Sequence, residues 1–127
     1  MKTLKHTIKK QWFDLIKSGV KKEEYKEIKP FWISRLLSFD DEMEFDVLLE
    51  MITEMQNPEK NYTCVQDLMV AFGVKFKHFD EDHFFNAAYF SEAKPNFKTG
   101  RKGIRIGTGK PEWGAVEGKY YFIIELN

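Results

Sequence analysis

The chain has 127 residues, no net charge, an apolar fraction of 43% and an aromatic fraction of 16%. This is enough for one domain that builds a core without metal or disulfide staples. A single cysteine excludes an internal disulfide and is typical of a reducing compartment, and no apolar run approaches membrane-spanning length. We therefore expect one cytoplasmic domain, residues 1–127, with no membrane association.

The zero net charge hides an uneven distribution along the chain. Residues 1–35 carry ten Lys and Arg against four Asp and Glu, a balance of +6. Residues 36–67 carry one against nine, a balance of −8, and residues 99–127 have a balance of +2. A neutral total argues against indiscriminate binding of polyanions. It leaves room for a local basic face, because exposed charges more than about 10 Å apart are largely screened at 0.1 M salt.

The first quarter of the chain predicts a strand, a short helix and a second strand. Apolar and polar residues alternate in LKHTI, which predicts a strand with one inward face and a satisfied core histidine at His6. An apolar stripe at helical spacing follows and stops at Gly19, a residue typical of the position after a helix. Period two returns in KEEYKEI, which predicts a strand from about Lys22 to Ile28, ended by Pro30.

The middle of the chain predicts a helical pair. Residues 40–56 have an apolar stripe and an acidic N-terminal end, which favours an acidic amphipathic helix. Thr63 and Gln66 form a capping-box pattern ahead of a second apolar stripe that stops at Gly73. Acidic helices over residues 40–72 would suit contact with a basic protein partner, although a solvated outer face explains the same charges.

The last third is strand-like. VKFKHF, FKTGRKGIRIG and KYYFIIEL alternate or are apolar, which predicts strands. HFDEDH, residues 78–83, matches no strong zinc spacing, so we interpret it as a solvated acidic turn and expect no metal. The whole order predicts an α+β domain with a mostly antiparallel sheet that curls into a small barrel.

Two stretches could carry chemistry. GTGKPEWG has Pro111 where a phosphate-binding P-loop needs Ser or Thr, so it predicts a glycine-rich turn. In that turn Lys110 and Trp113 would present a cation and a flat ring to a nucleotide.

The second stretch has the spacing G-x-K-x-x-E-x-K, from Gly19 through Lys21 and Glu24 to Lys26. Glu24 and Lys26 fall on one face of the predicted strand, with Lys21 just before it. Two ammonium groups beside one carboxylate would lower the pKa of Glu24 and keep it ionised. An exposed strand with ion pairs of little energetic weight gives the same spacing, so both interpretations stay open.

WFDLIKSGVKKEEYKEIKPFWISRL and, much later, KGIRIGTGKPEWG resemble the ASCH family of the PUA-like superfamily, whose signature is G-x-K-x-x-E-x-R after the first helix. The chain matches at Gly19, Lys21 and Glu24 and has Lys26 in place of Arg, which keeps the charge without the bidentate fork. The resemblance covers residues 1–36 and about 80–127. It implies a small PUA-like β-barrel with a cleft beside the motif, and residues 38–73 as a helical insertion.

The resemblance implies a module that binds RNA or a modified nucleotide, without a cofactor. Its cleft would be lined by the motif, with these neighbours: Lys10, Trp12, Arg105, Lys110 and Trp113. The alternative is a hydrolase of modified nucleosides or RNA, with Lys21 and Glu24 as the catalytic candidates. In amide-hydrolysing members the motif lysine works with a threonine three residues later. Glu24 stands at that place, and a carboxylate does not replace a nucleophilic hydroxyl, so binding is favoured over catalysis.

Overall fold

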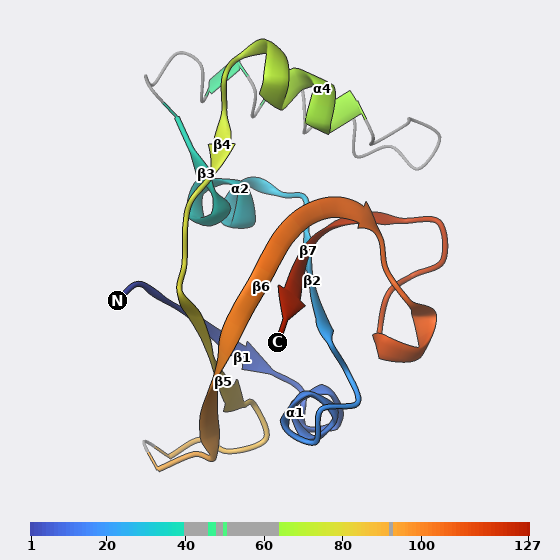
Figure 1. Ribbon diagram of the computed structural model, residues 1–127. Coiled ribbons are helices and arrows are strands. Elements are labelled where there is room, and N and C mark those ends of the chain that lie inside the picture. The colour runs from blue at the N-terminus through green and yellow to red at the C-terminus, as the bar shows by residue number, and fades with distance from the viewer. Residues whose placement is uncertain (40–45, 48–49, 51–63, 92) are drawn as a thin grey trace.

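The structure is a computed structural model that describes residues 1–39, 46–47, 50, 64–91 and 93–127 (Figure 1). In chain order the elements are β1 (Thr3–Ile8), α1 (Lys10–Lys17), β2 (Glu23–Glu27), α2 (Pro30–Leu36), β3 (Leu37–Ser38), α4 (Cys64–Ala71), β4 (Lys75–Phe76), β5 (Glu81–Asn86), β6 (Asn96–Thr108), the 3-10 turn η1 (Pro111–Trp113) and β7 (Tyr120–Leu126). In the described part of the chain, every helix is too short or too polar to cross a bilayer.

The first strand–helix–strand unit forms as its periodicity predicts. The inward residues of β1 are buried, and α1 buries Phe13 and Ile16 on one face. Helix α1 ends at Lys17 and is capped by Ser18, and Gly19 takes a φ of +83°, a left-handed conformation that glycine adopts with little strain. Strand β2 then starts at Glu23, within one residue of the predicted position. The predictions for these three elements are confirmed.

Pro30 both ends the β2 region and begins a helix that the sequence pattern did not assign. It is the first residue of α2. The N–H at this position makes no intrahelical hydrogen bond, so a proline, which has no N–H, fits there without loss. The helix buries Ile33 and Leu36 completely and contributes them to the core.

The main sheet has five strands in the order β1-β5-β6-β7-β2. The β1–β5 pair is parallel and the other three pairs are antiparallel. Strand β6 is long: its first half pairs with β5 and its second half with β7, and the register shifts between Arg101 and Gly103. The sheet therefore curls into a half-barrel whose edge strands are β1 and β2 (Figure 1). The predicted α+β class and the curled, mostly antiparallel sheet are confirmed: the sheet is mixed, with one parallel pair among its four strand pairs.

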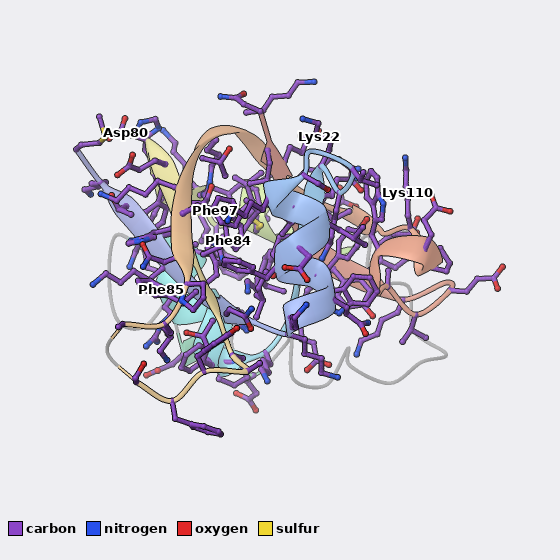
Figure 2. The ribbon with its side chains drawn as sticks, turned by 90° about the horizontal axis from the view of Figure 1, so that it is seen from below. Lys22, Asp80, Phe84, Phe85, Phe97 and Lys110 are labelled. Carbon is purple, nitrogen blue, oxygen red and sulfur yellow. The ribbon has the colours of Figure 1, made fainter. Side chains whose placement is uncertain are left out.

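Aromatic side chains fill the inside of this half-barrel. Phe84 is fully buried, and its ring centroid lies 5.6 Å from that of Phe97 and 4.5 Å from that of His6. Figure 2 shows Phe84 and Phe97 close together in the middle of the molecule. Phe97 also meets Phe13 of α1 edge-on, with centroids 5.0 Å apart, so the helix is anchored to the same cluster.

The interpretation of residues 78–83 as a solvated turn is wrong for its second half. Strand β5 begins at Glu81, and Asp82 is completely buried. A buried carboxylate is tolerated here because it finds two partners, His6 and Arg101, that lie far from it in sequence.

The second member of the predicted helical pair is α4, and Gly73 follows it with a φ of +68°. The first member lies outside the described residues apart from 46–47 and 50, so contact of helices 40–72 with a protein partner stays a prediction. Strands β3 and β4 pair with each other, which brings the two ends of the 38–73 segment side by side. Figure 1 places α4 at the opposite end of the molecule from α1.

Candidate functional site

A cleft with a volume of about 390 Å³ lies among the end of β1, helix α1, strand β2 and the η1 turn. Its lining combines four aromatic rings with two buried charged groups from the sequence motif. These residues are Trp12, Tyr25, Trp113, Tyr121, Lys21 and Glu24. A concave surface with flat rings and a few polar groups is the usual form of a small-molecule site.

Three charged side chains of the motif form one buried cluster below this cleft. The Nζ atom of Lys21 lies 2.9 Å from Oε1 of Glu24, and the Nζ atom of Lys26 lies 3.3 Å from Oε2. All three side chains are at most 8% exposed. The alternative of an exposed strand with weak ion pairs is therefore wrong for these residues, because the alternation of β2 turns Glu24 and Lys26 inward.

The cluster keeps Glu24 ionised. Burial by itself would raise the pKa of Glu24, but the charges of Lys26 and Lys21 and the Lys21 hydrogen bond outweigh it and lower that pKa. Burial lowers the pKa of Lys26, and Glu24 opposes that shift. The main-chain N–H of Tyr25 also donates to Oε1 of Glu24, at 3.3 Å. With both carboxylate oxygens engaged, Glu24 holds the lysines in place and is a poor base.

Aromatic rings surround the two ammonium groups. The Nζ atom of Lys21 lies 4.9 Å from the ring centroid of Trp12 and 5.6 Å from that of Tyr25. The Nζ atom of Lys26 lies 4.6 Å from the ring centroid of Trp32. Such contacts stabilise a cation that has lost its water. The rings beside Lys21 already contact a cation, so the cleft disfavours a ligand that is itself positively charged.

The glycine-rich turn forms the outer wall of the cleft, and two glycines allow its close packing. Gly114 has a φ of +99°, and a Cβ atom there would lie 2.9 Å from the Trp12 indole. A Cβ atom on Gly109 would lie 2.6 Å from the Tyr25 ring. The Tyr25 hydroxyl accepts a 2.9 Å hydrogen bond from the main-chain N–H of Lys110, which ties the turn to β2.

Four of the predicted site residues line the cleft: Trp12, Lys21, Glu24 and Trp113. They come from α1, the turn after it, β2 and η1, so residues about 100 positions apart meet at one place. Gly19 shapes the turn that leads to Lys21.

The other four predicted residues lie elsewhere. Lys26 is buried against Glu24 without lining the cleft, and Lys10 is exposed and pairs with Asp14 at 2.7 Å. Arg105 pairs with Glu23 at 3.0 Å. Lys110 lines a second cleft of about 260 Å³, which shares Trp113 with the first.

Several lining residues were not predicted from the sequence, above all Tyr25 and Tyr121. Tyr25 lies inside the motif, between Glu24 and Lys26. An aromatic residue at that place in a charged strand was a signal in the sequence that it belongs to the site. Tyr121 could be found only from the register of β2 against β7, in which Tyr121 faces Glu27. Lys119 lines the same cleft and forms a 3.1 Å ion pair with Glu27. This pair lowers the pKa of Glu27.

A second buried polar group lies on the inner face of β1 and β5. The Nε2 atom of His6 lies 2.8 Å from Oδ1 of Asp82, and Arg101 donates to the same carboxylate through Nε at 3.0 Å and through Nη2. Burial lowers the pKa of His6, and the charge of Lys26 adds to that shift. Burial would raise the pKa of Asp82, but its two partners lower it. His6 is buried as predicted but only half satisfied, because Nδ1 has no hydrogen-bond partner among the described residues.

The cleft thus offers aromatic surfaces beside one buried ammonium group. Comparisons of the chain with protein-family models, with curated proteins and with solved structures found no match. The geometry of this cleft is therefore the guide to what the chain binds.

Proposed function

We propose that the cleft binds a nucleotide base, presented in RNA or in a modified nucleotide. The single observation that carries the proposal is the buried ammonium group of Lys21 at the base of a cleft walled by Trp12 and Trp113. Flat rings bind bases by stacking, which contributes about 1–3 kcal/mol per base. The cleft volume of about 390 Å³ lies within the range of small-ligand sites.

The charges of the cluster define the preferred edge of the base. Lys21 has three N–H donors and gives one to Glu24. Glu24 already accepts from Lys21, Lys26 and a main-chain N–H, so it has little capacity left. Two ammonium groups against one carboxylate leave a charge of +1. The site therefore favours a base that presents carbonyl oxygens, such as uracil or guanine, over a cationic base.

We further propose that the half-barrel is the PUA-like barrel of the ASCH family. The helix-then-strand setting of Gly19, Lys21 and Glu24 and the cleft beside them support this assignment. Lys26 stands where the family has Arg. Its ammonium group is buried against Glu24 and Trp32, which fits a supporting role better than ligand contact.

The test is a binding screen of nucleosides and short single-stranded RNAs at low salt, followed by fluorescence anisotropy. Lys21→Met is expected to lose binding, because it removes the buried ammonium group that lines the cleft. Lys26→Met is the matched control: it removes an equally buried lysine from the same carboxylate, but that lysine does not line the cleft. Equal loss in both variants, or undetectable binding by the native chain, would refute the proposal.

A hydrolase is the second candidate, and the 2.9 Å contact between Lys21 and Glu24 inside a cleft is the observation that favours it. In this role Lys21 polarises the bond to be broken and Glu24 positions Lys21. The assay is turnover of acylated cytidines and of short RNA. Activity that persists at the native rate in Lys21→Met would remove Lys21 from the reaction.

A further inference from the structure

The second cleft, with a volume of about 260 Å³, adjoins the first through Trp113, which lines both. Three lysines line it: Lys22, Lys102 and Lys110. Figure 2 shows Lys22 and Lys110 on the same side of the molecule, away from Asp80. A ligand stacked in the first cleft therefore has a lysine-rich surface directly beside it.

The two carboxylates that line this second cleft interact with groups other than its three lysines. Glu23 accepts from Arg105 at 3.0 Å and from the Tyr25 hydroxyl at 2.7 Å, and Glu125 lies 3.9 Å from the same Arg105. Lys102 and Lys110 have no ion pair with any described residue. Three lysines and Arg105 against two carboxylates leave a local charge of +2, which favours an anion.

The backbone sets the positions of two of the lysines. Opposite β7, Arg101 faces Leu126 and Gly103 faces Glu125, so Lys102 is the extra residue of a β-bulge. A bulge takes a residue out of the ladder and redirects its side chain. Lys110 sits on the turn tied to Tyr25, and its Nζ atom lies 4.3 Å from the ring centroid of Trp113. This contact holds one ammonium group at the boundary between the two clefts.

We propose that the second cleft is a phosphate subsite, which takes the phosphate next to the base bound beside Lys21. The ligand class is then a phosphorylated nucleotide or a nucleotide chain rather than a free nucleoside. This inference rests on the proposed function, because it assigns the neighbouring group of the same ligand. Lys102 and Lys110 donate to the phosphate oxygens, and Trp113 stacks on the base.

The experiment compares uridine, uridine 5′- and 3′-monophosphates, a uridine dinucleotide and inorganic phosphate. Binding is followed by the indole N–H resonances and by affinity. The test variant is Lys102→Gln with Lys110→Gln. The control variant is Lys5→Gln with Lys75→Gln, which removes the same charge from exposed lysines that line neither cleft.

The native chain is expected to bind a phosphorylated ligand at least about tenfold more tightly than uridine, because hydrogen bonds to charged groups are worth that much. In the test variant the ratio of the affinity for the phosphorylated ligand to that for uridine should fall to about one, and the control variant should keep the native ratio. For a short RNA, the slope of log affinity against log salt should fall by about 0.7 in the test variant, because one phosphate contact is lost.

The outcomes separate the two proposals. Binding of uridine with no gain from any phosphate would overturn the phosphate subsite and leave the base cleft standing. Equal losses in the test and control variants would do the same, since they would show a general charge effect. Failure of every uridine ligand to bind, together with failure of every other nucleoside and RNA in the binding screen, would overturn both proposals.

Discussion

Replacement of Glu24 by Gln tests how the buried charge cluster is held together. The substitution keeps the size of the side chain and removes the carboxylate that contacts Lys21 at 2.9 Å and Lys26 at 3.3 Å. Both lysines then stay in a site where their side chains are 1% and 8% exposed. Removal of one partner of a buried ion pair typically costs about 3–5 kcal/mol, since it leaves an unmatched buried charge. We expect Glu24→Gln to lower the free energy of unfolding by about that amount at pH 7.

The measurement is urea unfolding of native chain, Glu24→Gln and a control, Glu27→Gln. Glu27 lies on the same strand and pairs with Lys119, but its side chain is 52% exposed, so its loss should cost less than about 1 kcal/mol. Equal costs for the two substitutions would refute the reasoning, because they would mean that burial of the cluster adds nothing.

The same variant should respond to pH in a defined direction. Burial lowers the pKa of Lys26, and the loss of Glu24 lowers it further. The folded variant then binds fewer protons than the unfolded chain, so its stability rises as the pH rises. The cost of Glu24→Gln should therefore shrink between pH 7 and pH 10, and a cost that grows over this range would contradict the account.

Three further predictions concern the core, the turn and acid stability. Phe84→Ala should cost about 3–5 kcal/mol in urea unfolding, because Phe84 is fully buried between two rings. Gly114→Ala should destabilise the chain by more than Gly118→Ala: both glycines have positive φ, but only at Gly114 would the new Cβ atom meet an indole, at 2.9 Å. Because burial lowers the pKa of His6 from 6.5, the folded chain resists its protonation and loses stability as the pH falls below about 6.5. His6→Gln should flatten that slope between pH 7 and pH 5 in urea unfolding, and a slope equal to that of the native chain would contradict this expectation.

Local periodicity predicted the elements that border the cleft. Alternation marked β1 and β2, helical spacing marked α1, and Gly19 marked the turn that presents Lys21. These features depend on residues within one turn or one strand, so they can be found in the sequence directly. The one-face placement of Glu24 and Lys26 followed from the same rule.

Partners distant in sequence could not be predicted in this way. The turn interpretation of HFDEDH was wrong because Asp82 is stabilised by His6 and Arg101, 76 and 19 residues away. Nothing in the local charge pattern distinguishes such a buried aspartate from a solvated one.

The sequence alone therefore determined the helix stop, the inward faces and the identity of the charged motif. Only the tertiary structure decided that Trp12 and Trp113 wall one cleft and that Lys110 faces a second one. It also decided that the charged motif is buried rather than exposed, and that Tyr121 joins the site. The physical reason is that strand order, strand register and the bulge at Lys102 bring together residues from opposite ends of the chain, whereas periodicity reports only which way a side chain faces.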